Sequence, residues 1–556
     1  MSRRFSVNAF GSLAAVLVTL CVLNVLPAWA QHGSEGSISV IVRDTSGSVV
    51  QDAQLELRDL ATNATQTAGT QDAGTYRFVN LPLGNYKLSV SKAGFKTAIF
   101  DPVIVQATKT TDISATLAVG TVSEVVVVND SGAPLVETSS SAISTVIDLK
   151  QIENLPIQGR DLAQLNRLVP GYTGTWDGLP SIAQGSNIDG VIGSSSRMKF
   201  GGNAAPSVSP RLEDIQEMTV QTNQLDLNQG YGQANMQTNF VTRRGGSTFH
   251  GRVFEDHRDA SLNANSWHND AVNFLNPNSP QIRKTPFILN DFGGSLGGPI
   301  IKDKLFFFGT FAMSKQPGST DAKAWVMTPA AQQGVFTYNN TQTVNVLQLA
   351  GNGGFPSTVI SQTATALAAA QKALQFASVV PSGDPNFVQL NWQVAAPTTI
   401  YYPTVRVDYN HSEKLRFNVA FNETKTSQPG ANPPNLPGPD FAKTGAGNQF
   451  KAYTAAFGND WTISSTLVNE FRGGFLYTYN GFAFNAPALD AKNPQISWNL
   501  PNLPDNTYNT AMNGTNFQIP TGSYYPLFNA SDTLTWQHKA HTMNFGISWW
   551  REQDHY

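Results

Sequence analysis

The sequence predicts a mainly β protein that ends in an antiparallel transmembrane β-barrel. Only 13% of the 556 residues are charged, about half of the usual share of about 25%. Many short runs alternate apolar and polar residues with a period of two, as half-buried strands do. Beyond the first thirty residues, no apolar run reaches the ~18 residues of a spanning helix. Strands closed into a barrel are the other way to cross a bilayer.

The charge balance excludes two broad classes of protein. Thirty-six Lys and Arg stand against 39 Asp and Glu, a formal net charge of −3. The chain therefore lacks the basic character of a nucleic-acid-binding protein, and we expect no nucleic-acid partner. It also lacks the high net charge of a disordered chain. A secreted array of sandwiches and an outer-membrane barrel remain.

Residues 1–30 are typical of a secretory signal peptide. Two arginines precede an apolar run over residues 13–26, which is too short to span a membrane. Ala28 and Ala30 supply the small residues required for cleavage before Gln31. The alternative is an uncleaved N-terminal anchor. The only cysteine, Cys21, lies inside this segment, so we expect a mature chain without disulfides.

Residues 35–119 predict a small β-sandwich, because alternating runs are separated by turns at intervals of about ten residues. The expected strands are Ser37–Asp44, Ala53–Leu60, Thr75–Leu81, Asn85–Gly94 and Thr110–Leu117. The turn and core residues of this segment resemble those of the carboxypeptidase regulatory-like domain, a prealbumin-like sandwich. The matching residues are Gly36, Val40, Asp44, Gly47, Gly74, Tyr76, Phe78, Leu81, Pro82, Gly84, Tyr86, Leu88, Val90, Gly94 and Phe95. The resemblance implies a fold and not a peptidase, since no zinc-ligand pattern accompanies it.

Residues 146–240 resemble the plug domain of TonB-dependent outer-membrane receptors, in the Oar-like group that carries a regulatory-like domain in front. The matching residues are Leu155, Pro156, Gly159, Arg160, Leu162, Leu165, Leu168, Pro170 and Gly171, followed by Asp189, Gly190 and Val191. The three leucines have helical spacing, and Pro170-Gly171 ends the helix. Residues 215–267 and 290–311 resemble the group's passage from plug to barrel and its first barrel hairpins. The resemblance implies a small α/β plug inside the barrel.

Residues 120–145 form a linker that begins with a β-prone run, Glu124-Val125-Val126-Val127-Val128. The resemblance implies a TonB box at or near this run. TonB captures such a peptide by strand addition, which uses backbone hydrogen bonds and needs no special side chains. The alternative is an ordinary edge strand of the sandwich or of the plug. Both interpretations remain open.

Residues 241–556 predict barrel strands. In Leu415–Asn422, Leu, Phe and Val alternate with Arg, Asn and Ala, the dyad pattern of an outer-membrane strand. Aromatic residues near strand ends could form interfacial girdles: Tyr401, Tyr402, Tyr477, Tyr479, Trp549 and Trp550. Short turns alternate with long insertions such as Gln316–Thr399, which we expect to be a loop. About ten strands reach the spanning length of ~9–11 residues.

No pattern indicates catalysis, a cofactor or a metal site. His538 and His541 flank a predicted turn and have no Cys or carboxylate cluster beside them. We therefore expect no catalytic residues, no metal and no enzyme. Arg243 and Arg244 are expected to be solvated or to form ion pairs between plug and barrel.

The family resemblance implies a receptor in the outer membrane with its sandwich in the periplasm. It would take up a bulky ligand, such as a siderophore, glycan or peptide, with energy from TonB and its inner-membrane motor complex. Its other partners would be outer-membrane lipid and an unknown extracellular ligand. The alternative is a surface β protein that does not transport, such as an adhesin or a carbohydrate-binding module.

The barrel region is short for this class, because outer-membrane transporters have about 22 strands. About ten strands cannot enclose a plug. We therefore expect an incomplete barrel, in a chain that is the N-terminal portion of a longer receptor.

Overall fold

The computed structural model describes residues 35–555, with gaps at 72, 122–124, 129–142, 156, 174–183, 196–206, 223–235, 276, 278–280, 282–283, 285–286, 340, 360, 382, 433–435, 439–445, 483–520 and 539–540. The expected signal peptide, with Ala28, Ala30 and Gln31, lies outside the described residues. Among the described helices, none combines the length and apolar character needed to cross a membrane.

The N-terminal part is a sandwich of two sheets, as predicted. One sheet has the order β4 (Thr75–Leu81), β1 (Gly36–Asp44), β7 (Thr110–Leu117). The other has the order β3 (Thr65–Gly69), β2 (Gln54–Asp59), β5 (Gly84–Ser91), β6 (Thr97–Val105), β8 (Val125–Val128). Alternate residues of each strand enter one apolar core, whose buried members all lie between Ile38 and Leu117. The sandwich therefore has a complete core of its own.

A second, mixed sheet follows, which we call the inner sheet. Its order is β11 (Val191–Ile192), β10 (Gln184–Ile188), β13 (Met236–Thr242), β12 (Ile215–Thr222), β9 (Ile143–Ile147). The short helices α2 (Leu149–Asn154), η1 (Gln158–Arg160) and η2 (Leu162–Leu168) lie between β9 and β10 in the chain. Asp148 and Gln151 form a capping box that starts α2.

The predicted helical leucines lie in η2, which is a 3-10 helix. Leu162 and Leu165 are buried, but Leu168 is 55% exposed. Leu168 therefore stays outside the core, although it shares the helical spacing of the other two leucines. It is the last residue of the helix, and the next residue, Val169, enters the core in its place.

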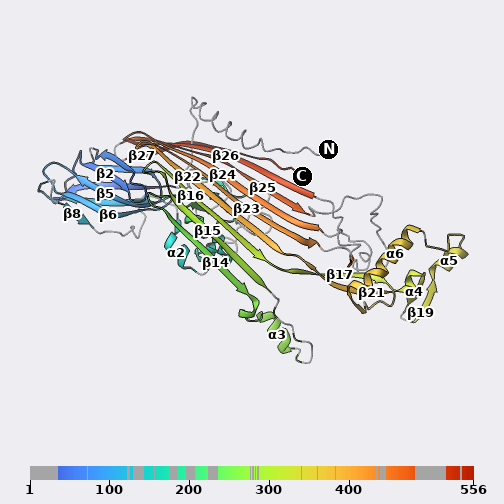
Figure 1. Cartoon of the computed structure of the whole chain (residues 1–556). Coiled ribbons are helices and arrows are strands. Elements are labelled where there is room, and N and C mark those ends of the chain that lie inside the picture. Colours follow the sequence, from blue (N-terminus) through green and yellow to red (C-terminus); the bar gives the residue numbers. More distant parts are fainter. Residues whose placement is uncertain are drawn as a thin grey trace.

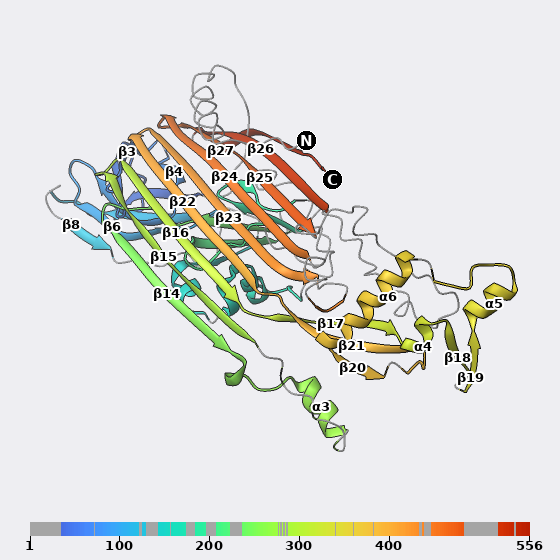
Figure 2. The same ribbon diagram turned by 45° about the vertical axis from the view of Figure 1, so that its right-hand side comes forward.

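Nine long strands form the third sheet, in chain order from β14 to β27 and antiparallel throughout. They are β14 (His250–Asp259), β15 (Ile288–Ile301), β16 (Leu305–Gln316), β22 (Thr398–Ser412), β23 (Leu415–Asn432), β24 (Ala446–Ser464), β25 (Leu467–Phe482), β26 (Thr521–His538) and β27 (His541–Glu552). We call them the barrel strands. Within the described part of the chain the sheet is curved but open, with β14 and β27 at its edges (Figure 2).

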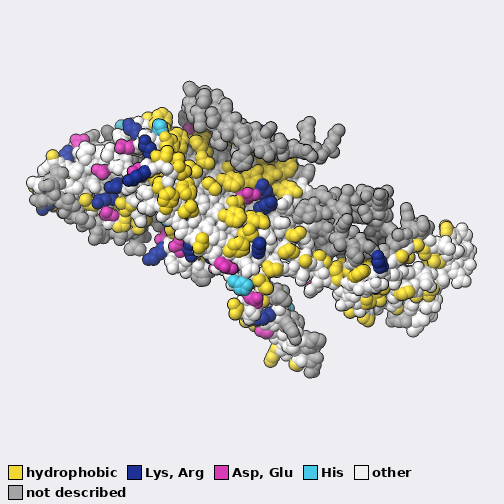
Figure 3. All heavy atoms as spheres, in the orientation of Figure 1, with side chains coloured by type: hydrophobic (Ala, Val, Ile, Leu, Met, Phe, Trp, Pro, Cys, Tyr) yellow, Lys and Arg dark blue, Asp and Glu magenta, His cyan; other side chains and the backbone are white. Residues whose placement is uncertain are grey.

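The two faces of the barrel strands differ in chemistry, which confirms the predicted dyad. Buried positions carry Thr404, Asn422, Thr454 and Thr533, whereas Val405 and its counterparts on other strands are about half exposed. Hydrophobic side chains gather over these strands in Figure 3, while charged side chains gather over the sandwich.

The expectation that Tyr402 belongs to an aromatic girdle was wrong. Tyr402 is 7% exposed and lies on the inner face, where the guanidinium of Arg211 stacks 4.3 Å from its ring centre. Tyr477 does belong to an aromatic row, since its ring stacks on Tyr453 and Tyr524 of the neighbouring strands. Trp549 and Trp550 are exposed on the edge strand β27.

The two ends of the barrel strands also differ (Figure 1). The short turns lie beside the sandwich, as the hydrogen bond from Asn63 to Asp303 shows. The long connections lie at the opposite end, which we call the far end. One of them contains η5 (Ala260–Leu262) and α3 (Trp267–Leu275).

The insertion between β16 and β22 is not the loop that we expected, but a folded unit that we call the far-end lobe. It has a sheet of β17 (Ser319–Met327), β21 (Phe387–Ala395) and β20 (Ser378–Pro381), and a hairpin of β18 (Val335–Tyr338) and β19 (Gln342–Asn345). Its helices are α4 (Pro329–Gln332), α5 (Val346–Asn352), α6 (Ser361–Ala373) and η6 (Leu374–Phe376). Two small apolar clusters hold the lobe together.

Candidate functional site

The run Val125–Val128, which the sequence allowed to be either a TonB box or an ordinary edge strand, forms β8 at the edge of a sandwich sheet. β8 pairs in parallel with β6, in a register that runs from Thr97–Val125 to Phe100–Val128. No other described strand pairs with the opposite edge of β8. An edge strand still offers a free row of backbone groups for strand addition. Glu124 lies outside the described residues, and the use of this segment as a TonB box stays a prediction.

The residues of the predicted plug motif lie in short helices and turns around the inner sheet. They are Leu155 at the C-cap of α2, Gly159 and Arg160 in η1, Pro170 and Gly171 in the turn after η2, and Asp189 and Gly190 in the turn between β10 and β11. Pro156 lies outside the described residues. Gly159 has a φ of 68°, which favours glycine.

Two arginines join the inner-sheet region to the barrel strands. Arg160 forms ion pairs with Glu213 and with Asp256 of β14. The buried Arg211 lies 2.6 Å from Asp291 of β15. Removal of one member of such a buried pair leaves an uncompensated charge. These pairs therefore hold the inner sheet against β14 and β15.

Two buried carboxyl groups lie in the same region. Burial raises the pKa of Asp214 to about 6, although the hydroxyl of Thr310 donates a hydrogen bond to it. Burial also raises the pKa of Glu217 to about 7. Glu217 lies on β12, and its carboxylate accepts a hydrogen bond of 2.6 Å from the backbone N–H of Ala107 in the sandwich. Glu217 thus joins the inner sheet to the sandwich.

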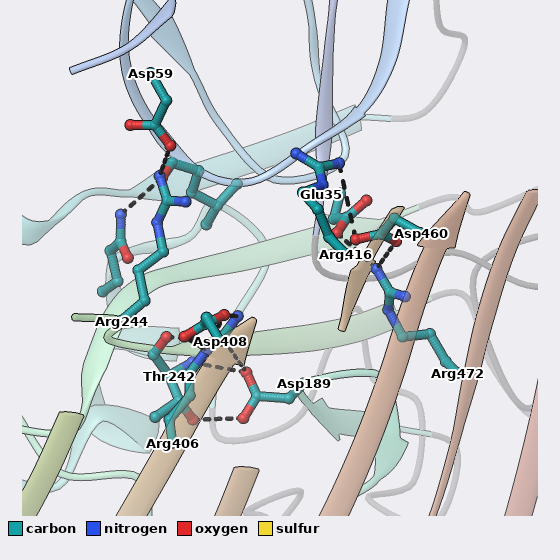
Figure 4. A network of polar contacts seen from close by, with 12 residues as sticks. Glu35, Asp59, Asp189, Thr242, Arg244, Arg406, Asp408, Arg416, Asp460 and Arg472 are labelled. Atoms are coloured by element: carbon teal, nitrogen blue, oxygen red, sulfur yellow. Dashed lines mark hydrogen bonds and ion pairs between the residues drawn. The ribbon is translucent and has the colours of Figure 1, made fainter. Parts of the chain in front are cut away.

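The motif residue Asp189 lies in a second cluster on the inner face of the barrel strands (Figure 4). Its carboxylate accepts a hydrogen bond of 2.9 Å from the N–H of Thr242 and forms an ion pair of 3.1 Å with Arg406 of β22. Asp408 pairs with the same arginine at 2.8 Å. This cluster joins the β10–β11 turn to the barrel.

The sandwich contacts the barrel region through Arg244, which follows the inner sheet in the chain. Its guanidinium lies 2.9 Å from the buried carboxylate of Asp59 and donates to the carbonyl of Leu83 at 2.8 Å. Figure 4 shows this pair beside the Asp189 cluster. Arg243 instead pairs with Glu153 of α2. The expectation of plug-to-barrel pairs was therefore wrong for both arginines, because Arg244 faces the sandwich and Arg243 the helix before η1.

Two arginines of the barrel strands also reach the sandwich. Arg472 of β25 lies 2.6 Å from Glu35 and 2.7 Å from Asp460 of β24. Arg416 of β23 donates to the carbonyl of Asn80 at 2.5 Å. Burial raises the pKa of Glu35 well above its usual value.

The carboxylates of Glu35, Asp460 and Glu470 lie within 4.8 Å of one another, a spacing that suits a metal ion. Arg472 forms ion pairs with all three of them. Its guanidinium therefore supplies the positive charge at this point, and the cluster is an ion-pair network.

The sequence did not identify this interface between the sandwich and the barrel. Arg416 was visible as an inward-facing residue of an alternating strand. Its partner Asn80 is 336 positions away in the chain, and no local pattern joins the two. The only sequence feature that could have indicated the interface was the position of Arg416, a charged residue on the inward face close to a short turn.

Comparisons with known proteins agree with this architecture. Residues 241–556 match the family described as outer membrane beta barrel domain, and residues 37–118 match the carboxypeptidase regulatory-like domain. The TonB-dependent transporter Oar of Myxococcus xanthus is 28% identical over 305 residues, which are 52% of this chain and 25% of that protein.

Among solved structures, the siderophore receptor PirA from Acinetobacter baumannii superposes with a TM-score of 0.42 at 12% identity, over 74% of this chain and 48% of that one. The outer membrane transporter YddB from Escherichia coli gives 0.41 at 9% identity, over 71% and 45%. The chain thus spans about a quarter of the curated relative and about half of these receptors.

The barrel match covers more than half of the chain, and it coincides with the nine strands that have an apolar outer face. The predicted location in the outer membrane is therefore confirmed. The protein belongs to the outer membrane beta barrel domain family and carries a carboxypeptidase regulatory-like domain in front of its barrel strands.

Proposed function

We propose that this protein is a TonB-dependent receptor that takes up a bulky ligand, such as a siderophore, glycan or peptide. The inner sheet is the observation that carries the proposal. Its core includes Ala452, Leu476 and Leu527 of the barrel strands, and its ion pairs reach β14, β15 and β22. A sheet held in this way on the inner face suits a plug. The relationship to the transporter Oar supports the same function.

In this proposal a signal peptide of residues 1–30 directs export, and the sandwich of residues 35–119 lies in the periplasm. Residues 120–145 link it, through the TonB box, to a plug of residues 146–240, and barrel strands follow from residue 241. The far-end loops and the lobe face outward and meet the ligand. TonB and its inner-membrane motor complex supply the energy. The proposal involves no catalysis and no cofactor.

TonB would add a strand to β8 and then pull on it. Successive backbone N–H groups of a strand point to opposite edges, so one of Val125 and Val126 donates toward β6 and the other toward the free edge. Proline at either position removes that donor.

The test compares Val125→Pro, Val126→Pro and, as a control, Val126→Thr, using the purified periplasmic domain of TonB as the probe. One proline variant should bind TonB roughly tenfold more weakly, equivalent to about 1.4 kcal/mol. The threonine variant should bind as the wild type does. If both proline variants bind normally, the segment is not the TonB box. A wild type that does not bind TonB would favour a surface protein that does not transport.

A further inference from the structure

The sandwich and the inner sheet differ in how they are attached to the barrel strands. The buried core of the sandwich contains residues of the sandwich alone. The buried core of the inner sheet includes Ala452, Leu476 and Leu527 from the barrel. The sandwich can therefore leave with its core intact, whereas the inner sheet cannot move without breaking apolar contacts.

The contacts that hold the sandwich are mostly polar. They include the pairs Arg244–Asp59 and Arg472–Glu35, and the hydrogen bonds from Arg416 to Asn80, from Ala107 to Glu217 and from Ser247 to Ala61. One small apolar cluster, Leu83, Ala107 and Val241, accompanies them. Charged groups regain their hydration when such an interface separates. This interface therefore opens at a lower cost than an apolar one of the same area.

A pull on β8 acts on the sandwich, because β8 is a strand of one of its two sheets. β8 pairs with β6, and residues 118–124 connect it to β7 even if that pairing breaks. We propose that the docked sandwich closes the inner end of the barrel, and that its separation from Arg244, Arg416 and Arg472 is the first step of TonB-driven opening. This inference rests on the proposed function.

Separation of the sandwich would uncover the inner-sheet surface that it now covers. Leu83 of the sandwich lines a small cleft together with Asp189, Thr242, Arg244 and Arg406. The next contacts to resist the pull are then those of the Asp189 cluster with β22. The order of events is therefore sandwich first and inner sheet second.

A disulfide can test this order, because it can join the sandwich to the barrel region. A Cβ built on Gly246 lies 4.0 Å from the Cβ of Ala61, within the ~3.5–4.5 Å range of disulfides. Neither residue belongs to the ion pairs described above. The variant Ala61→Cys/Gly246→Cys should lock the sandwich in place when oxidised. The control is Glu56→Cys/Thr67→Cys, which joins opposite residues of β2 and β3 within the sandwich.

The measurement is single-molecule force spectroscopy on the full chain in detergent, with the TonB periplasmic domain on the cantilever. The wild type and the oxidised control should show an early rupture before the inner sheet extends. The oxidised lock should lose that rupture, and reductant should restore it. The same early rupture in the oxidised lock would overturn the inference and leave the proposed function standing. A TonB domain that never attaches to the wild type would overturn both.

Discussion

At the residue scale, Arg244 shows how one side chain can join the sandwich to the end of the inner sheet. It follows the last strand of the inner sheet, pairs with Asp59 of the sandwich and lines the same small cleft as Asp189 and Arg406. Gly84 of the sandwich lies against it, since a Cβ there would be 3.1 Å from the guanidinium. A motif glycine of the sandwich is therefore also a contact for the barrel region.

Glu217 should make stability depend on pH. Its pKa rises from 4.5 to about 7 on folding, chiefly by burial, so the folded state keeps a proton that the unfolded state loses. The stabilisation is complete below pH 4.5 and disappears as pH rises through 7, by an amount on the order of 3 kcal/mol.

The Glu217→Gln variant keeps an acceptor for Ala107 but does not titrate. We expect its thermal unfolding in detergent to lose the part of the pH dependence that falls between 4.5 and 7. Asp214 contributes with the same sign in both proteins, so the difference between them is the informative quantity. Equal slopes in the two proteins would contradict this account.

At the element scale, the turn before β4 depends on a glycine. Gly74 has a φ of 66°, and a Cβ there would lie 2.9 Å from the carbonyl oxygen of Val42. We expect Gly74→Ala to destabilise the sandwich by roughly 1–3 kcal/mol. Gly94→Ala is the matched control, because Gly94 has a φ of 87° with nothing within 4 Å. Protease sensitivity of the sandwich in the full chain should rise more for Gly74→Ala than for the control.

The sequence predicted the strands that alternate clearly and missed those that do not. Thr75–Leu81 and Thr110–Leu117 were predicted with their observed ends. β3 was missed because its sequence, TQTAG, has no apolar face. β6 was missed because Asp101 and Pro102 interrupt its alternation, close to a register shift in its pairing with β5.

At the scale of the whole molecule, the open sheet leaves two edges. Within the described chain, β14 and β27 each pair with one strand of this sheet, and an open sheet edge is unstable in lipid. We therefore expect residues 1–556 alone to lack the heat-modifiable migration of a closed barrel in detergent gels. A complete outer-membrane barrel treated in parallel is the control. A heat shift together with stable single-channel conductance would disprove the expectation.

The candidate site was predictable only in part. Motif resemblance pointed to Arg160 and Asp189, and both proved to hold the inner sheet against barrel strands. Their partners Asp256 and Arg406 lie 96 and 217 positions away. Local sequence patterns carry no information on such distant pairs. These pairs depend on how the sheet of barrel strands curves around the inner sheet.

The far-end lobe affects how β16 and β22 pair during folding. β16 and β22 are adjacent in the sheet although the whole lobe separates them in sequence, and closing so long a loop costs entropy. Within the lobe, Ser319 pairs with Ala395, and just beyond it Gln316 pairs with Thr398. A lobe that folds first brings the ends of these two strands together already in register. The lobe therefore acts as a short connection despite its length, and its outer surface can change in evolution without disturbing the order of the strands.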